Sequence, residues 1–128
     1  MPARDTYHDA VKNALIKDGW TITHAPLTLK LEGDRVLIDL GAERLLAAEK
    51  GIRKIAVEVK TFTGPSRMAD LEQALGQYVL YRIFLKQTEP TQELYLAVPQ
   101  DTIEDLFRMA IGRGFLEDER GKVQSVRL

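Results

Sequence analysis

The chain has 128 residues, 45% of them hydrophobic, which predicts one domain spanning residues 1–128 with a substantial core. Cysteine is absent, which excludes disulfides and thiolate catalysis and is typical of a cytoplasmic protein. The net charge of -1 excludes a strongly basic DNA coat protein, and the sequence has neither an apolar signal segment nor a run long enough to span a membrane.

The first third of the chain predicts a helix followed by short strands. Apolar residues recur at helical spacing over residues 5–18, where Asp5 is placed to cap the helix and Gly19 to end it. The strands that follow are separated by turn residues such as Pro26 and Gly33. We predict them at residues 20–24, 27–32 and 35–40.

Residues 41–54 are ambiguous between a helical turn and one arm of a hairpin that turns at Gly51, and we favour the hairpin because a strand follows at once from Ile55. Ser66 then caps a long helix that reaches about Lys86. Six of its apolar residues are predicted to face inward: Met68, Leu71, Leu75, Tyr78, Val79 and Leu85.

The C-terminal part predicts a central strand at residues 93–98, because this segment is almost continuously apolar. A helix is expected over residues 99–109, and residues 113–128 suggest a final hairpin or edge strand around Gly121. The order of elements predicts an α/β (α+β) fold in which helices flank a mixed central β-sheet.

Two strand-like runs carry acids that a buried strand normally avoids. Asp39 ends the run VLID, and the run IAVEVK contains Glu58 and Lys60. Because side chains alternate along a strand, Glu58 and Lys60 share one face. If the two runs pair, the three side chains can converge at one point, although Glu58 and Lys60 could also simply face solvent.

Two carboxylates and an ammonium at one point would form a site for a divalent metal and a phosphate. Mg²⁺ or Mn²⁺ would take oxygen ligands from Asp39, Glu58 and the backbone carbonyl of Val59. Lys60 would orient a water or stabilise charge on the phosphate. These residues therefore predict metal-dependent hydrolysis of phosphodiester bonds, with Asp39, Glu58 and Lys60 as the catalytic residues.

Other polar residues are candidates for the same site. Gln73 and Gln77 lie one helical turn apart and could bind a phosphate or a water, or could belong to a solvated helix face. His8 or Asp9, near the start of the first helix, could complete the metal shell or could be surface residues.

Familiar motifs for other chemistries are missing. The sequence contains no P-loop, GxGxxG, HExxH or GxSxG motif. Basic residues gather in the middle of the chain, either as a patch for nucleic acid or as partners for nearby acids, and the second is the default. They are Arg44, Lys50, Arg53, Lys54, Lys60, Arg67 and Arg82.

The order of Asp39, the Glu58-Val59-Lys60 triplet and a glutamine-bearing helix resembles the PD-(D/E)XK nuclease superfamily. Ile38 stands where that motif has its leading proline. The resemblance implies a restriction-endonuclease-like αβββαβ core over residues 5–98.

Longer stretches resemble the XisH family, the fdxN element excision controlling factors of cyanobacteria. They are ARDTYHDAVKNALIKDGWTITH, IDLGAERLLAAEKG, KIAVEVKTF, LEQALGQYVLYR and LYLAVP, within residues 3–99. This resemblance implies a role in programmed DNA rearrangement beside a site-specific recombinase and a companion protein, XisI. By resemblance, the catalytic-type residues are Asp39, Glu58 and Lys60, with a first-helix position at His8 or Asp9.

Three hypotheses follow from these observations. The first is a metal-dependent endonuclease that cuts or nicks DNA. The second is a non-catalytic DNA-binding accessory protein that has kept the fold. The third is a protein-interaction subunit that pairs with the XisI-like companion, or with itself as a homo-oligomer, through an exposed strand edge.

Overall fold

The computed structural model describes residues 3–46, 51–118 and 123–126. Its helices are α1 (Ala3–Lys17), α2 (Arg67–Thr88), α3 (Gln100–Arg108) and α4 (Ala110–Asp118). Its strands are β1 (Thr21–His24), β2 (Leu27–Leu31), β3 (Asp34–Ile38), β4 (Leu40–Leu45), β5 (Ile52–Val59), β6 (Gln92–Pro99) and β7 (Val123–Val126). No helix within these ranges is both long and apolar enough to cross a membrane.

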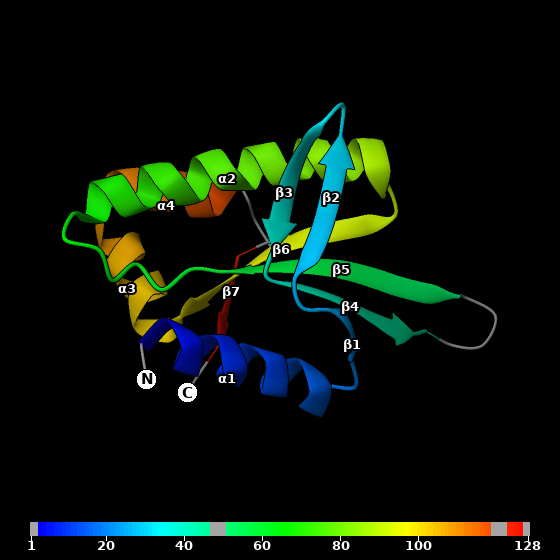
Figure 1. Cartoon of the computed structure of the whole chain (residues 1–128). Helices are drawn as coiled ribbons and strands as arrows, with labels where there is room; N and C mark the ends of the chain where they lie inside the picture. Colours follow the sequence, from blue (N-terminus) through cyan, green and yellow to red (C-terminus); the bar gives the residue numbers. More distant parts are fainter. Residues whose placement is uncertain (1–2, 47–50, 119–122, 127–128) are drawn as a thin grey trace.

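A five-stranded mixed sheet, in the order β1-β4-β5-β6-β7, forms the centre of the molecule. The pairs β1–β4 and β4–β5 are antiparallel, whereas β5–β6 and β6–β7 are parallel. Helix α1 lies on one side of this sheet and α2 on the other (Figure 1). The arrangement confirms the predicted mixed sheet flanked by helices, and α1, β1, β4, β5, α2 and β6 supply the αβββαβ order.

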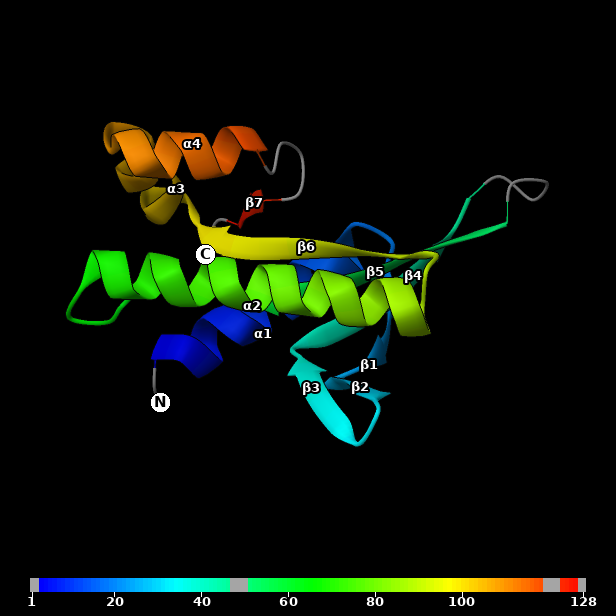
Figure 2. The ribbon, with the colours of Figure 1, turned by 90° about the horizontal axis from the view of Figure 1, so that it is seen from above.

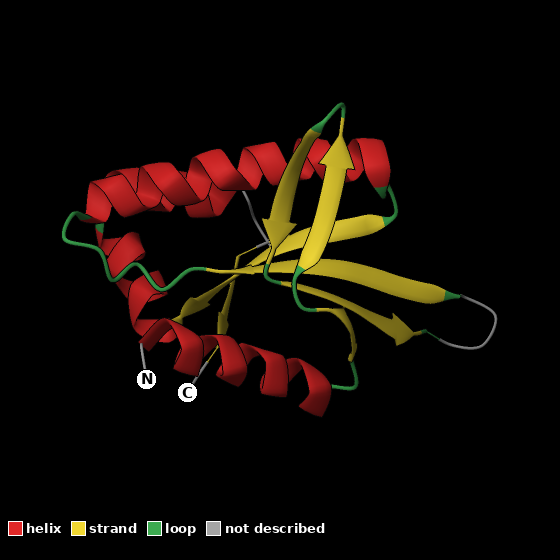
Figure 3. Cartoon of the chain, in the orientation of Figure 1, coloured by secondary structure: helices red, strands yellow, loops and turns green. Residues whose placement is uncertain are grey.

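Strands β2 and β3 form a separate two-stranded sheet between β1 and β4 in the chain. This hairpin rises from the main sheet along the side of α2 (Figures 1 and 3). It packs there through buried apolar residues, including Leu27, Leu29 and Ile38, which belong to the same core cluster as Leu71 and Tyr78 of α2. The hairpin therefore forms a wall beside the α2 face of the sheet.

Strand β5 has two different faces because its side chains alternate. Ile55, Val57 and Val59 pack in a cluster with Tyr7 and Val11 of α1. Ala56 belongs to the opposite cluster, with α2. Glu58 alternates with these residues as predicted, and it therefore lies on the α2 face.

The hairpin predicted for residues 41–54 is confirmed, because β4 and β5 pair from Leu40–Val57 to Leu45–Ile52. The single strand predicted over residues 35–40 is wrong. Strand β3 ends at Ile38 and pairs with β2, and a new strand, β4, begins at Leu40 in the main sheet. Asp39 lies at the bend between the two strands, because one segment serves two sheets there.

The predicted start of α2 is confirmed, since Oγ of Ser66 accepts a hydrogen bond from the N–H of Ala69 at 3.2 Å. Its predicted inward face is wrong in part, because Met68, Leu75 and Val79 are exposed. The helix carries apolar residues on more than one side, so spacing alone does not identify the core side. The buried residues are Leu71, Ala74, Tyr78, Tyr81, Phe84 and Leu85.

The C-terminal prediction is partly confirmed. The edge strand is present as β7, next to β6, and α3 follows Pro99 as expected. Residues 110–118, however, form a helix, α4, where a hairpin arm was one of the predicted options. Two glycines within it, Gly112 and Gly114, weaken the helical signal of the segment. The predicted turn at Gly121 lies outside the described residues.

Candidate functional site

Asp39 and Glu58 come together because of the register between β4 and β5. Leu40 lies opposite Val57 in this antiparallel pair, so the preceding residue, Asp39, comes to lie beside Glu58. The predicted convergence is therefore observed, although it is β4, and not the strand that precedes Asp39, that pairs with β5.

Each of these two carboxylates is held by the backbone of the other segment. The N–H of Asp39 donates to Oε1 of Glu58 at 3.1 Å, and the N–H of Val59 donates to Oδ2 of Asp39 at 2.8 Å. Charge-assisted hydrogen bonds of this kind fix side-chain positions more firmly than neutral ones. The two acids are thus fixed at the end of the β4–β5 ladder.

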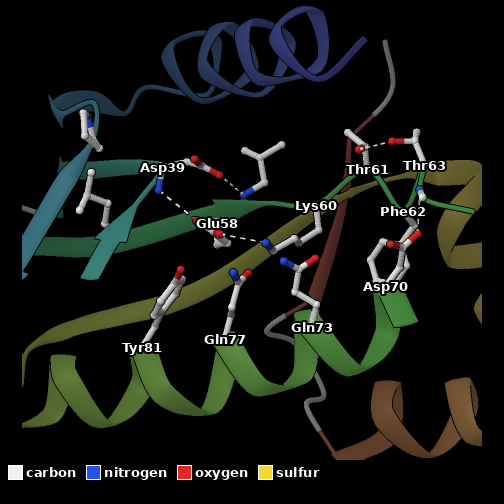
Figure 4. A pocket seen from close by; sticks show the side chains of 14 residues that line it. Asp39, Glu58, Lys60, Thr61, Phe62, Thr63, Asp70, Gln73, Gln77 and Tyr81 are labelled. Atoms are coloured by element: carbon white, nitrogen blue, oxygen red, sulfur yellow. Dashed lines mark hydrogen bonds and ion pairs between the residues drawn. The ribbon is translucent and has the colours of Figure 1, made fainter. Parts of the chain in front are cut away.

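Lys60 completes the predicted group. Its side chain is only 16% exposed, and its Nζ lies 3.3 Å from Oε2 of Glu58. Its backbone N–H donates to the carbonyl of Ala97 on β6, so the chain is still held against the sheet at this point. The ammonium and the two carboxylates therefore share one pocket (Figure 4).

Among the described residues, Glu58 is the only polar or charged residue that is buried, with 3% of its surface exposed. Burial, followed by the nearby charge of Asp39, raises the pKa of Glu58 from 4.5 to about 7, and the charge of Lys60 offsets part of this rise. A carboxylate in this state gains from any further positive charge placed next to it.

The three residues lie in an open pocket of about 470 Å³ between the ends of β3 and β5 and one side of α2. Gln73 and Gln77 line the same pocket and extend from α2 toward Lys60 and Glu58 (Figure 4). The remaining lining residues are Pro26, Leu37, Val59, Thr61, Phe62, Thr63, Gly64, Asp70 and Tyr81. All five of the residues predicted to act in catalysis or substrate binding thus lie around one cavity.

The amide oxygen of Gln77 is buried and has no hydrogen-bond partner among the described residues. A buried acceptor without a partner is uncommon in proteins, because its lost hydration is not replaced. A water or a ligand in the pocket would supply the missing donor. This atom therefore marks a second polar contact point opposite Glu58.

His8 and Asp9 are not brought to the pocket. They lie on α1, where Nδ1 of His8 is 3.9 Å from Oδ1 of Asp9, and neither lines the cavity. Helix α1 packs on the opposite face of the sheet through Tyr7 and Val11. Their predicted part in a metal shell consequently finds no support in the geometry.

The donor set of the pocket fits Mg²⁺ or Mn²⁺. Asp39 and Glu58 supply hard carboxylate oxygens, and Mg²⁺ commonly uses only one or two of these beside water and phosphate. In a strand the N–H and the C=O of one residue point to the same side, so the carbonyl of Val59 faces Asp39, as its N–H does. Side chains alone do not provide a complete set of metal ligands, since no cluster of three or more His, Asp or Glu residues occurs within the described ranges.

The sequence interpretation missed Asp70 and Tyr81, which also line the pocket. Both continue the row of Gln73 and Gln77 along α2 at spacings of three and four residues, so extending that row would have found them. Oδ2 of Asp70 accepts a hydrogen bond from the N–H of Gly64 at 2.9 Å, which holds the loop before α2 in place. In the sequence, Gly64 and Pro65 mark this loop as a break before the helix, but they do not indicate its contact with Asp70.

Several of the basic residues in the middle of the chain are paired with acids. Arg44 lies 3.4 Å from Asp18, and Arg53 lies 3.7 Å from Glu93. Arg67 lies 3.7 Å from a carboxylate oxygen of Asp105 on α3. These three arginines balance acids and do not form one separate basic patch, which agrees with the default interpretation of the sequence.

Comparison with known proteins gives one family. The family model described as XisH protein matches residues 1–125. The crystal structure of an XisH family protein from Nostoc punctiforme PCC 73102 is 38% identical, with a TM-score of 0.80 over 93% of this chain and 88% of that one. That of a fdxN element excision controlling factor protein from Anabaena variabilis is 39% identical, with a TM-score of 0.82 over 95% and 90%. No curated protein matches the chain.

Proposed function

The chain belongs to the XisH family, and from this premise we propose that its pocket binds a divalent cation and hydrolyses phosphodiester bonds of DNA during the control of element excision. The supporting observation is the convergence of Asp39, Glu58 and Lys60 at the end of β5. Two acids and a lysine in an open pocket are costly for a fold to keep without a ligand.

The burial of Glu58 supports a cation at this point. Its raised pKa shows that the protein alone stabilises the charged form poorly, even with Lys60 at 3.3 Å. A cation held by Asp39, Glu58 and the carbonyl of Val59 would supply the missing positive charge. When bound, such a cation polarises a phosphate and lowers the pKa of its water.

The chain's own residues have distinct tasks in this proposal. Lys60 stabilises negative charge that develops on the phosphate or orients the attacking water. The amide oxygen of Gln77 accepts a hydrogen bond from a water in the pocket, and Gln73 contacts the phosphate nearer the opening. Asp39 and Glu58 keep their places because backbone N–H groups hold them.

We propose the biological role from the name of a relative of known structure. The Anabaena variabilis protein is called a fdxN element excision controlling factor, and its structure matches 95% of this chain. We assign the same setting here, in which a site-specific recombinase and an XisI-like companion protein complete the machinery for DNA rearrangement. The chain would then process or hold a DNA intermediate and would not recombine the ends itself.

Cleavage of supercoiled, linear and branched DNA tests this proposal. The parent chain should cut at least one of these substrates with Mg²⁺ or Mn²⁺, alone or with the companion protein. Asp39→Asn, Glu58→Gln and Lys60→Met should each lower the rate by at least about a hundredfold, as is usual when a group that stabilises the transition state is lost.

Glu43→Gln is the matched control, because Glu43 is an acid on β4, the strand that follows Asp39, but lines a different cavity with Lys54. This variant should cut DNA at the parental rate. Equal cleavage by the parent and Glu58→Gln would contradict the proposal, because it would place the activity elsewhere or in a contaminant.

A second function, a non-catalytic accessory role, is favoured by the pairing of the mid-chain arginines. Because Arg44, Arg53 and Arg67 already face acids, these three arginines offer little free positive charge to a DNA duplex. DNA binding that weakens steeply with salt, without cleavage in any metal, would contradict this argument and indicate a DNA-binding accessory role. Binding to the companion protein alone would place the chain among interaction subunits.

A further inference from the structure

The outer side of α2 carries a second apolar face that the fold does not cover. Four large apolar residues lie along it, Met68, Leu75, Val79 and Ile83, with 44%, 41%, 36% and 45% of their surface exposed. Figure 2, which looks down on α2, shows no described element crossing over the helix, whereas α3 and α4 lie beside its N-terminal half. Contiguous exposed apolar surface of this kind usually marks a contact with another molecule.

Two charged residues lie in the same line as the apolar ones. At 100° per residue, Glu72, Leu75, Ile83 and Lys86 all point within about 40° of the direction of Val79. Within the described ranges, neither Glu72 nor Lys86 makes an ion pair. We call the six residues the outer stripe: Met68, Glu72, Leu75, Val79, Ile83 and Lys86.

Five residues of the outer stripe are arranged symmetrically about Val79, and Met68 has no counterpart because α2 ends at Thr88. Leu75 and Ile83 each lie four positions from it, and Glu72 and Lys86 each lie seven positions from it, on opposite sides. A second α2 that runs antiparallel, with a two-fold axis at Val79, would place Leu75 against Ile83. It would also place the Glu72 carboxylate against the Lys86 ammonium, twice per pair.

We propose that the outer stripe is a self-association surface, through which two copies of this chain form a two-fold symmetric dimer by antiparallel packing of α2. A two-fold interface requires one patch that is complementary to itself, and the order acid, apolar, apolar, apolar, base meets that requirement. Antiparallel packing also sets the opposite ends of the two helix dipoles side by side.

The dimer contact and the pocket use different sides of α2. Gln73 and Gln77 project from the side of α2 that faces the pocket, away from the stripe (Figure 4). The dimer therefore leaves both pockets open. This surface is also different from the strand edge expected from the sequence.

Sedimentation equilibrium of the full chain tests the dimer. At roughly 100 µM the parent should be mainly dimeric, as for any Kd in the low micromolar range. Val79→Glu places like charges against each other at the two-fold axis and should give a monomer with an unchanged circular dichroism spectrum. Leu80→Glu is the matched control, because Leu80 is 46% exposed and adjacent, yet lies outside the stripe, and it should stay dimeric.

A charge exchange tests the antiparallel register. Glu72→Lys or Lys86→Glu alone should each raise the dimer Kd by roughly tenfold, since two exposed ion pairs change from attraction to repulsion. The double variant should restore the parental Kd, a result that a mere loss of stability would not produce. Both positions are exposed, so these variants should fold normally.

Several outcomes would overturn the proposal. A parent that is monomeric at this concentration would do so, as would a double charge variant without recovery. A monomeric parent whose stripe instead binds a separate companion protein would assign the surface to that partner. The inference is independent of the proposed function, because Val79→Glu should keep parental metal binding.

Discussion

The N–H of Asp39 donates to Oε1 of Glu58 at 3.1 Å, although the two residues lie 19 positions apart in the chain. This contact arises because the chain leaves the β2–β3 hairpin at Ile38 and enters the main sheet at Leu40. The bend between the two sheets therefore places Asp39 next to Glu58. The site is a consequence of how two sheets share one segment.

The stability of the metal-free protein should fall as the pH rises from 4.5 to 7. Folded Glu58 has a raised pKa of about 7, so the folded state binds more protons than the unfolded state in this window. The contribution is fully present below pH 4.5 and is lost as the pH passes 7, a total of about 3 kcal/mol in the free energy of unfolding.

Urea unfolding of the parent and of Glu58→Gln at a series of pH values measures this effect. The difference between the two proteins should change across the window, because the amide of the variant does not titrate. A difference that stays constant from pH 4.5 to 7 would show that Glu58 titrates normally.

Removal of Lys60 should raise the pKa of Glu58 further. The ammonium lies 3.3 Å from Oε2 of Glu58 and is the group that lowers this pKa, so Lys60→Met should move the titration above pH 7. Carboxyl carbon NMR of Glu58 gives the value directly. Lys54→Met is the control, because Lys54 lies on β5 with Glu58 but lines another cavity, and it should leave the titration of Glu58 unchanged.

Gln77→Leu should not destabilise the metal-free protein. The buried amide oxygen of Gln77 has no partner among the described residues, so its removal relieves a cost and should leave the free energy of unfolding equal or raised by up to about 1 kcal/mol. Thermal unfolding beside Gln73→Leu, an exposed control, measures this. A loss above about 2 kcal/mol would show that the amide already has a strong partner.

Ser66→Ala should lower the free energy of unfolding by about 1 kcal/mol, the usual value for loss of an N-cap. The hydroxyl oxygen accepts from the N–H of Ala69 at 3.2 Å, and α2 forms one side of the pocket. Ser66→Asp should keep parental stability, because aspartate caps as well as serine does. Equal losses in both variants would indicate a role for Ser66 other than capping.

The residues that gather in the pocket were predictable from local sequence, whereas the path by which Asp39 reaches it was not. Alternation along one strand places Glu58 and Lys60 on the same face, and a serine before an amphipathic run predicts the start of α2. The position of Asp39 depends on a change of sheet after Ile38, which no local pattern encodes.

The face of α2 shows a second limit of sequence reasoning. The helix has apolar residues on two sides, so spacing groups Leu71 and Tyr78, which are buried, with Leu75 and Val79, which are exposed. Only the packing of the sheet and the β2–β3 hairpin decides which side is covered. The same ambiguity explains both the wrong inward face and the outer stripe.

Isothermal titration of Mn²⁺ into the full chain at pH 7.5 tests the central claim most directly. The account predicts one site in the parent and in Glu43→Gln, and at least about a tenfold weaker site in Asp39→Asn and Glu58→Gln, as expected when an ionic ligand is lost. Parental affinity in both Asp39→Asn and Glu58→Gln would contradict it.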